Sequence, residues 1–276
     1  MANRKGMTGK SIIGGVGGAV LTGMALLIWS VTGRSDESWC SLDPTRKRPR
    51  VGEDYTPTST QLRALLHYAT SPHIPQQSLA EITLTFRVLK SMARPSNILV
   101  FGLGHDSLMW DSFNSGGTTL FLEEDPKWVQ MVLKDAPGLR AHTLQYHTPL
   151  RQAGPLLSSY RSEPACSPSL PYLRGNHRCK LALSNLPDEV YDQDWDLIII
   201  DTPGRMAAIF SAAVMARTRR ASGATHIVLH DVDREAVKVY AYEFLCSYNL
   251  VNAVGKLWHF QIPPNLAHHP PPSRFC

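Results

Sequence analysis

The chain has 276 residues, of which 43% are hydrophobic and 18% charged, and its formal net charge at pH 7 is +5. The composition excludes an intrinsically disordered protein, and the length suits one large α/β domain with short appendages. Much of the small positive charge lies in one basic run, residues 46–50, so the charge gives little support to a nucleic-acid partner and we expect none.

The first part of the chain contains a long stretch without charge. Residues 12–31 supply about the twenty apolar or small residues that a bilayer-spanning helix needs. We therefore predict a cytoplasmic tail at 1–11 and a transmembrane anchor at 12–31, although the glycines of the stretch also fit a cleaved signal peptide or a glycine-rich loop. Basic residues lie on both sides of the stretch, so the positive-inside rule alone leaves its orientation open.

Residues 32–59 are rich in proline, serine, threonine and charge without periodicity, which predicts a stem or linker. Two helical segments follow, TQLRALLHYAT and SLAEITLTFRVLKSM, the first with Thr58 or Ser59 near its N-cap. The folded domain is placed at 60–263. The remaining tail, 264–276, is so rich in proline that we predict it to be disordered.

Apolar runs of strand length alternate with helical segments through this domain, which predicts a parallel sheet covered on both faces. The candidate strands are Ile98–Gly102, Thr119–Leu122, Ala141–Tyr146, Leu197–Ile200 and His226–Leu229. The final stretch, LVNAVGKLWHFQIP, predicts instead two short antiparallel strands. A doubly wound sheet that ends in an antiparallel hairpin is typical of the Rossmann-like class I methyltransferase fold, and this α/β fold is the prediction.

A glycine-containing turn follows the first predicted strand in the stretch NILVFGLGHDS. Gly102 and Gly104 stand where the strand turns into a helix, and glycine there lets the backbone approach a ligand without an intervening side chain. Asp106 or Ser107 can cap that helix, whose free N–H groups favour electron-rich ligand atoms. The dinucleotide fingerprint has a third glycine that this sequence lacks, so a simple tight turn is the alternative.

Three acids, Glu123 to Asp125, end the second predicted strand about twenty residues after the glycines. An acid at this position bonds a ribose 2′-hydroxyl in nucleotide-binding sheets. One of the three is therefore expected to point at a ribose, and the other two to cap the next helix.

Two more predicted strands end in polar residues at the same edge of the sheet. Asp201 follows an apolar run in WDLIIIDTPGRM and could accept a proton from a substrate hydroxyl, orient a methyl donor or cap the next helix. The stretch THIVLHDVDRE brings His230, Asp231 and Asp233 to this edge. His230 is a candidate base because an unperturbed imidazole titrates at about pH 6.5, with a structural histidine as the alternative, and His105 has the same two interpretations.

The five cysteines include no pair with the spacing of a zinc site, so we expect no metal. Cys166 and Cys179 flank the loop CSPSLPYLRGNHRC. A disulfide that staples this loop and two free thiols are equally consistent with the sequence.

Taken together, these stretches resemble the plant glucuronoxylan 4-O-methyltransferase and irregular-xylem-fifteen family, whose shared region is called the polysaccharide biosynthesis domain. The resemblance covers about residues 60–263 and includes ILVFGLGHDSLMW, GGTTLFLEEDPKW, LPDEVYDQDWDLIIID, PGRMAAIFSAAVMAR and HDVDRE. Other stretches, among them YLRGNHRCKLAL and GKLWHFQIPP, look more like the irregular-xylem-fifteen branch than the methyltransferase branch.

The methyltransferase branch of that family transfers methyl from S-adenosylmethionine to O4 of glucuronic acid on xylan, in the Golgi. The resemblance thus implies a protein of xylan biosynthesis whose partner is xylan or another glucuronic-acid-bearing polysaccharide. It implies that Gly102, Gly104 and Glu124 bind S-adenosylmethionine and that Asp201 lies near the transferred methyl. It also implies a type II Golgi membrane protein with its domain in the lumen, where Cys166 and Cys179 would form a disulfide.

The chain departs from the family pattern directly after Asp201. Family members usually continue through about nine more loop residues before Pro-Gly-Arg-Met, whereas here Asp201-Thr-Pro runs straight into Gly204. This motivates a second hypothesis, a non-catalytic scaffold that supports other xylan-synthesising proteins in the Golgi membrane. A nicotinamide-dependent oxidoreductase is disfavoured by the missing third glycine and the terminal hairpin.

Overall fold

The computed structural model describes residues 56–169, 172–265 and 274–276. The predicted cytoplasmic tail, the anchor at 12–31 and most of the predicted stem lie outside these residues. Within the described part of the chain, no helix combines the length and the apolar character needed to cross a bilayer.

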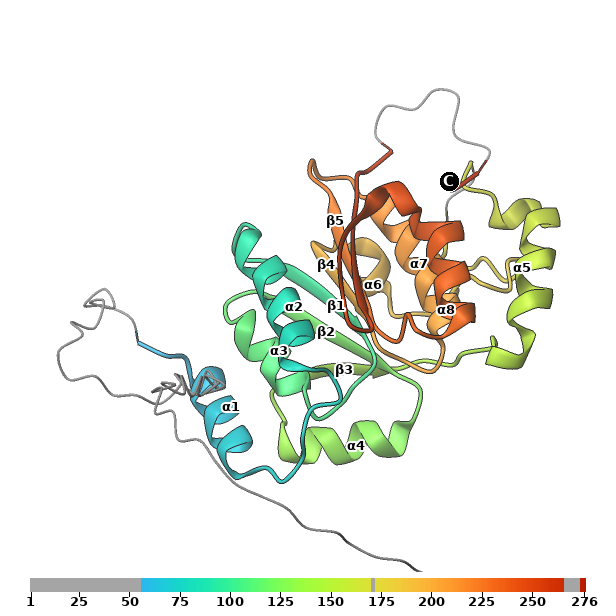
Figure 1. Ribbon diagram of the computed structural model, residues 1–276. Helices are drawn as coiled ribbons and strands as arrows, with labels where there is room; N and C mark the ends of the chain where they lie inside the picture. The colour runs from blue at the N-terminus through green and yellow to red at the C-terminus, as the bar shows by residue number, and fades with distance from the viewer. Residues whose placement is uncertain (1–55, 170–171, 266–273) are drawn as a thin grey trace, which may run out of the picture. The chain divides into compact units, whose positions relative to one another are not determined.

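The domain is built on a seven-stranded sheet with the order β3-β2-β1-β4-β5-β7-β6. Its strands are β1 (Asn97–Phe101), β2 (Thr118–Glu123), β3 (Arg140–Thr143), β4 (Leu197–Ile200), β5 (Thr225–Leu229), β6 (Leu250–Val254) and β7 (Leu257–Ile262). The first five are parallel, and β7 runs antiparallel to both β5 and β6. The Rossmann-like sheet with a terminal antiparallel hairpin is therefore confirmed (Figure 1).

Helices cover both faces of this sheet. They are α1 (Ser59–Thr70), α2 (Leu79–Ser91), α3 (Ser107–Phe113), α4 (Pro126–Asp135), α5 (Ala153–Ser162), α6 (Asp188–Asp192), α7 (Arg205–Thr218) and α8 (Glu235–Tyr240), which continues as the π-helical turn η3 (Ala241–Leu245). Helices α1 to α4 contribute to one buried apolar cluster and α5 to α8 to the other (Figure 1). Side chains of β1 alternate between the two: Ile98 and Val100 face the first group, Leu99 and Phe101 the second.

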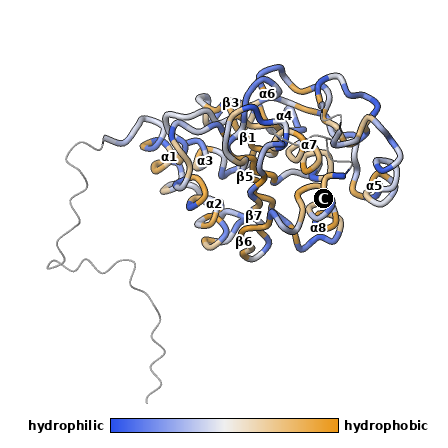
Figure 2. The backbone as a smooth tube through the Cα atoms, turned by 90° about the horizontal axis from the view of Figure 1, so that it is seen from above, coloured by the Kyte–Doolittle hydropathy of each residue, from blue (hydrophilic) through white to orange (hydrophobic). Residues whose placement is uncertain are grey.

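Because helices cover both faces of the sheet, its central strands β1 and β4 are almost entirely apolar and lie in the hydrophobic centre of the tube in Figure 2, whereas the outer parallel strand β3 is polar and partly exposed. β4 illustrates this, since all four residues of Leu197–Ile200 are buried. The polar side chains are left to the strand ends, where the candidate functional residues lie.

Capping boxes start the first two helices. The Thr58 hydroxyl accepts a hydrogen bond from the Gln61 N–H, and the Gln61 side chain accepts one from the Thr58 N–H. Ser78 and Glu81 form the same reciprocal pair at the start of α2. Of the two N-cap residues that the sequence allowed for α1, the structure uses Thr58.

β3 is shorter than predicted and ends at Thr143 rather than Tyr146. The Leu144 N–H still donates to the Glu123 carbonyl, at 2.9 Å, and the chain then leaves the sheet. The Tyr146 ring packs on Gly204, where an added Cβ would lie 2.1 Å from the ring. The end of the predicted strand therefore crosses over the start of α7 instead of extending the sheet.

The structure describes the predicted disordered tail, 264–276, only in part: residues 266–273 lie outside the described residues, whereas the last two residues pack on the domain and correct the prediction there. Phe275 is only 5% exposed and packs edge-on against Phe244, and Arg217 donates to its carbonyl oxygen at 3.2 Å. Cys276 forms a disulfide with Cys246. The prediction weighed the proline content of the tail and missed its last two residues, of which Phe275 packs in the core and Cys276 forms a disulfide.

A second disulfide joins Cys166 and Cys179, as the family resemblance implied. It closes the loop between the end of α5 and α6, and both sulfur-bearing residues are buried. Two disulfides within one domain are typical of proteins that fold in an oxidising compartment.

The Cys246–Cys276 disulfide closes a segment with a sequence separation of 30 residues. The double variant Cys246→Ser/Cys276→Ser should lose about 2–4 kcal/mol of unfolding free energy, because the open chain has more conformational freedom when unfolded. Denaturant titration followed by fluorescence measures this loss. With both native disulfides reduced, variant and wild type should unfold at the same denaturant concentration, and equal stability under oxidising conditions would contradict the pairing.

Candidate functional site

The two predicted catalytic residues lie side by side at the carboxyl edge of the parallel strands. Asp201 follows β4, and its N–H donates to the Phe101 carbonyl of β1 at 2.9 Å. His230 follows β5, and its N–H donates to the Ile200 carbonyl at 3.1 Å. Backbone hydrogen bonds of the sheet thus fix where both side chains begin, and this edge is where open α/β sheets bind their ligands.

A buried arginine joins the ends of β4 and β5. Arg205, in the first turn of α7, places its Nη2 2.7 Å from Asp201 Oδ1 and 2.8 Å from Asp231 Oδ2. Its Nη1 donates to the Thr202 carbonyl at 2.5 Å, and its Nε donates to the His230 carbonyl at 3.4 Å. The Arg205 side chain is 9% exposed, so these charge-assisted bonds are shielded from water and hold the two strand ends together.

Asp201 and His230 also contact each other. His230 Nδ1 lies 3.3 Å from Asp201 Oδ2 and 3.4 Å from Asp231 Oδ1, and the imidazole is almost fully buried. Gln77, from the loop before α2, donates to the same Asp201 oxygen at 3.4 Å. Both carboxylates face the Nδ1 side of the ring, which favours a proton on Nδ1.

The two side chains shift each other's pKa. Burial opposes ionisation of Asp201, but His230, the Arg205 charge and Gln77 together outweigh it and lower the pKa of the Asp201 carboxyl. Burial likewise opposes protonation of His230, but Asp201 and the charges of Asp231 and Glu81 outweigh it and raise the pKa of the imidazole. The pair is therefore built to carry a proton on His230 opposite an ionised Asp201.

Buried polar atoms without a hydrogen-bond partner gather at this edge. Among the described residues they include Gln77 Oε1, Tyr146 Oη, Thr148 Oγ1, Thr202 Oγ1 and His230 Nε2, the ring nitrogen that faces neither carboxylate. These atoms come from residues that follow β3, β4 and β5 or that contact Asp201. Because buried polar groups are normally paired, a concentration of orphans marks a place where a polar ligand or ordered water completes the bonding.

The predicted glycine cradle has the backbone geometry that requires glycine. Gly102 has φ of 118°, and a Cβ there would lie 2.2 Å from the Asp201 carbonyl oxygen. The next two N–H groups are held from the sides: Leu103 donates to Glu123 Oε2 at 3.0 Å and Gly104 to Ser107 Oγ at 2.9 Å. The loop after β1 therefore packs closely on the end of β4, and Gly102 and Gly104 place no side chain between them.

Of the three acids at the end of β2, one caps the next helix, where two caps were expected, and the ribose contact of another stays a prediction. Glu123 is buried, and its carboxylate accepts the N–H groups of Leu103, Glu124 and Asp125. Asp125 caps α4 through the Lys127 N–H, at 2.9 Å. The Glu124 side chain is exposed, and its carboxylate forms no hydrogen bond or ion pair with the rest of the described chain. Burial and the two neighbouring acids raise its pKa, which indicates a position that gains from a donor.

A pocket of about 360 Å³ opens beside Glu124. Its walls come from the ends of β2 and β3, the segment 180–186 and α7, and they combine apolar and amide or hydroxyl groups: Leu144, Gln145, Leu183, Ser184 and Asn185. Gly102, Gly104 and Asp106 are not part of its lining, and lie on the adjoining loop that Glu123 ties to β2. A mixed wall of this kind next to an unpaired carboxylate suits a nucleoside.

Three other predicted residues lie elsewhere. Asp106 forms no capping hydrogen bond, and its carboxylate accepts from the Trp110 Nε1–H at 2.8 Å, so the expected cap is corrected to an anchor within α3. His105 stacks on His73 with ring centroids 3.9 Å apart. Asp233 pairs with Lys256 at the surface. Whether Asp106 contacts a cofactor stays a prediction.

A cation could in principle use the same carboxylates. Asp201, His230 and Asp231 each offer a ligand atom, and these atoms lie within 4.8 Å of one another. Arg205 already donates to both carboxylates and supplies the compensating positive charge. The expectation that no metal is held here stays a prediction.

Sequence reasoning missed Arg205, Gln77 and Tyr146. A signal for Arg205 existed, because it follows Asp201 by four residues at the start of a helix, the spacing of an ion pair. Gln77 contacts Asp201 across 124 positions, and no local pattern announces such a contact. Tyr146 was assigned to a strand that ends before it.

Comparison with known proteins shows the family to which the chain is related. The family model described as IRX15/IRX15L/GXM matches residues 80–260. Arabinogalactan O-methyltransferase 1 of Arabidopsis thaliana is 54% identical over 96% of each chain, and glucuronoxylan 4-O-methyltransferase 1 of the same plant is 42% identical over 73% of each chain. Protein IRREGULAR XYLEM 15 of Arabidopsis thaliana is 36% identical over 79% of this chain and 70% of its own.

These identities differ from the expected position nearer the irregular-xylem-fifteen branch. The methyltransferases share 39% to 54% of aligned residues with this chain, against 36% for the irregular-xylem-fifteen protein. The expectation rested on a few short stretches, whereas the identity averages over the whole domain.

Proposed function

Because the chain belongs to the IRX15/IRX15L/GXM family, we propose that it transfers a methyl group from S-adenosylmethionine to a hydroxyl of a cell-wall polysaccharide. The observation that carries the proposal is the shared edge of the sheet. There the bare glycine loop, an unpaired acid beside a pocket, orphaned buried polar atoms and a contacting Asp–His pair meet. A tight turn or a structural histidine would explain each feature alone, but not all of them in one place.

Different residues of the site suit the ribose and the base of the cofactor. Gly102 and Gly104 let the loop after β1 pack closely on Asp201 and Asp106, and in this turn they would let the cofactor approach the backbone, as at other nucleotide sites. Glu124 would accept from the ribose hydroxyls, and the pocket beside it would take the base. When bound, S-adenosylmethionine supplies a methyl group on a sulfonium, which is reactive toward an oxygen nucleophile.

The chain's own part in the reaction is to position the acceptor hydroxyl and remove its proton. Asp201, ionised by its neighbours, orients His230 and stabilises the imidazolium, and His230 in its neutral form takes the proton. Arg205 fixes both strand ends, so that the distance between base and loop does not vary. General-base help of this kind typically contributes about 10²–10⁴-fold to the rate.

The acceptor best supported is an arabinogalactan-type polysaccharide. The relative at 54% identity is named as an arabinogalactan O-methyltransferase, and it aligns along almost the whole chain. Xylan, the acceptor that the sequence resemblance implied, is the second candidate, supported by the 42% identity to a glucuronoxylan 4-O-methyltransferase. Competition between the two polymers in one assay ranks them directly.

We place the protein in the Golgi membrane with its domain in the lumen. The two disulfides support an oxidising compartment, because the thiols of a domain in the cytosol would be kept reduced. A fluorescent fusion examined for protease protection in intact vesicles tests both the compartment and the orientation.

The scaffold alternative, with other xylan-synthesising proteins as partners, rests on the short connection after Asp201. In the structure this connection, residues 202–204, runs directly into Arg205 and brings it to both carboxylates. The alternative predicts that Asp201→Asn still restores a mutant plant that lacks the protein, and failure to restore would count against it.

Replacing Glu124 with glutamine should weaken S-adenosylmethionine binding about tenfold, because a charge-assisted bond to the ribose becomes a neutral one. Isothermal calorimetry on the purified chain measures this directly. Glu235→Gln is the matched control, since its side chain is 80% exposed at the start of α8 and should leave the affinity unchanged. If both variants bound S-adenosylmethionine with equal affinity, Glu124 would not be part of the cofactor site. If wild type did not bind it, the proposed cofactor would be wrong.

A further inference from the structure

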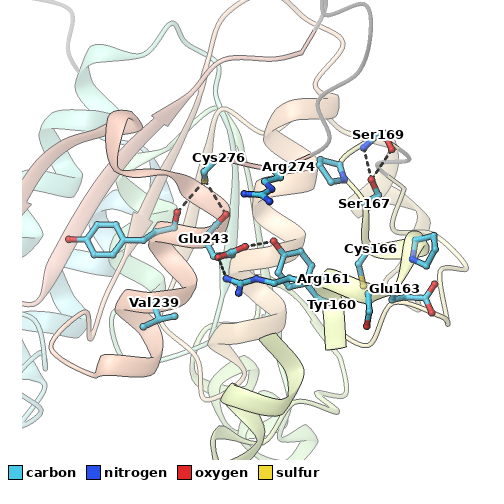
Figure 3. A pocket seen from close by; sticks show the side chains of 14 residues that line it. Tyr160, Arg161, Glu163, Cys166, Ser167, Ser169, Val239, Glu243, Arg274 and Cys276 are labelled. Atoms are coloured by element: carbon cyan, nitrogen blue, oxygen red, sulfur yellow. Dashed lines mark hydrogen bonds and ion pairs between the residues drawn. The ribbon is translucent and has the colours of Figure 1, made fainter. Parts of the chain in front are cut away.

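We propose that a second groove, away from the reacting edge, binds a carboxylate-bearing stretch of the acceptor polysaccharide; this rests on the proposed polysaccharide substrate. The distal groove is a cavity of about 870 Å³ between the end of α5, the turn η2 (Pro164–Cys166), η3 and the last residues of the chain. The polar side chains that carry the inference are Arg161, Glu163, Ser167, Ser169, Glu243 and Arg274 (Figure 3).

The distal groove is separate from the Asp201 site. α8 starts next to the end of β5 and leads away from the reacting edge, so that Glu243 lies roughly 12 Å along the helix from Glu235, at about 1.5 Å per residue. In Figure 1 the C-terminus lies at the top, whereas α4, which follows the carboxyl end of β2, lies at the bottom. No residue that lines the groove also lines the pocket beside Glu124.

Two disulfides fix the walls of the groove. Cys166, in one wall, is tied to Cys179, and Cys276, in the other, is tied to Cys246. Walls held by cross-links lose little conformational freedom when a ligand binds, which favours binding by preorganisation.

One arginine of the groove forms no ion pair within the described chain, although its charge helps to lower the pKa of the Glu243 carboxyl. Arg161 pairs with Glu243 at 2.7 Å, and Glu163 pairs with Arg178 at 3.0 Å, so these charges compensate. Arg274 is exposed, and among the described residues it forms no hydrogen bond or ion pair, not even with the chain-terminal carboxylate two residues on. Figure 3 shows it between Glu243 and the wall that bears Ser167.

A pair of serine hydroxyls faces the same cavity. Ser167 Oγ and Ser169 Oγ lie 2.7 Å apart, and the Ser169 N–H donates to Ser167 Oγ. One hydroxyl proton bridges the two oxygens, so the other is left to donate to a ligand. An arginine with free donors and a nearby hydroxyl are the groups that recognise a carboxylate, which the guanidinium binds in bidentate fashion.

A carboxylate on a sugar chain fits these groups better than a free anion does. The groove is open, its volume of about 870 Å³ exceeds that of a single sugar ring, and Pro164 and Val239 add apolar surface to its lining. Uronic acids are the sugars that bring a carboxylate to a polysaccharide. A polymer held here at one residue would raise the local concentration of its other residues at the reacting edge.

The test is binding of a glucuronic-acid-bearing arabinogalactan to the full chain without S-adenosylmethionine, by biolayer interferometry. Arg274→Glu should weaken this binding at least tenfold, whereas Arg87→Glu, an exposed arginine on α2 over the opposite face of the sheet, should change it less than twofold. The same polymer with its carboxyl groups reduced to alcohols should bind wild type as weakly as it binds Arg274→Glu.

A second variant, Ser167→Ala/Ser169→Ala, removes the hydroxyl pair and leaves every charge in place, so a weaker loss of about threefold is expected from it. Unfolding curves and intact mass of the disulfide-bonded chain show whether each variant is folded. Equal affinity of Arg274→Glu and Arg87→Glu, or equal affinity of wild type for native and reduced polymer, would overturn the inference. Methyl transfer by wild type to a short acceptor is measured separately, and its absence would contradict the proposed function without altering the binding result.

Discussion

Replacing Arg205 with methionine should lower the free energy of unfolding by about 3–5 kcal/mol and remove methyl transfer. Arg205 is the buried partner of two carboxylates, on Asp201 and Asp231, and also binds the carbonyl oxygens of Thr202 and His230. Methionine fills similar space but removes the buried positive charge between the two acids, which leaves Asp231 with the exposed Arg234 and both acids with His230. Urea titration gives the stability, and labelled methyl incorporation gives the activity.

Arg234 offers a matched control because it contacts the same oxygen, Asp231 Oδ2, at the same 2.8 Å, but with a side chain that is 53% exposed. Arg234→Met should cost less than about 1 kcal/mol, since solvent screens an exposed pair. If both arginine variants were equally stable, the buried contacts of Arg205 would contribute no more to the free energy of unfolding than a surface ion pair does.

Replacing Asp201 with asparagine should lower kcat by about 10²–10⁴ while leaving the protein folded. The amide keeps the shape of the side chain but loses the charge that orients His230 and raises its pKa. His230→Gln should cost a similar factor. Because the two act as a unit, the double variant should be no slower than the slower single variant, and multiplicative losses would show that they act separately.

The same pair sets the pH dependence. Neutral His230 is the base, so the wild-type rate should rise as pH passes the pKa of His230, which lies above its ordinary value of 6.5. In Asp201→Asn this limb of the residual rate should move to lower pH, because the carboxylate that favours the imidazolium is gone. A limb that moved to higher pH would contradict the assignment of the base.

Linkage gives the corresponding signs for stability. The folded-state pKa of His230 is raised, so its contribution is fully present below about pH 6.5 and is lost as pH rises through the folded pKa. The folded-state pKa of Asp201 is lowered, so its contribution is present above its unfolded pKa and is lost as pH falls through the folded one. Both contributions together are largest between these two windows.

The fold was accessible from the sequence because its signals are local and repeated. Apolar runs such as Leu197–Ile200 can only be buried strands, and the break at Gly255 separates two runs that pair antiparallel. The C-terminal end was not accessible in this way. The packing of Phe275 and the pairing of Cys276 with Cys246 depend on a partner 30 residues earlier, which no local pattern identifies.

The residues of the candidate site likewise fall into those that local sequence patterns identify and those that only the tertiary structure shows. The ends of parallel strands meet at one edge, so Asp201 and His230 could be brought together from their positions alone. That Glu124 is the acid of the three whose carboxylate has no partner required the hydrogen bonds of Glu123 and Asp125, which no sequence pattern gives. Gln77, which contacts Asp201 from another part of the chain, required the tertiary structure.

The most direct test of the central claim is transfer of labelled methyl from S-adenosylmethionine to arabinogalactan by the purified full chain, with Asp201→Asn as the blank and glucuronoxylan as the competing acceptor. We predict incorporation into base-stable methyl ethers of the polymer that depends on wild-type protein and falls to near background in the variant. Folded wild-type protein that binds S-adenosylmethionine but methylates neither polymer, or a variant as active as wild type, would contradict the account.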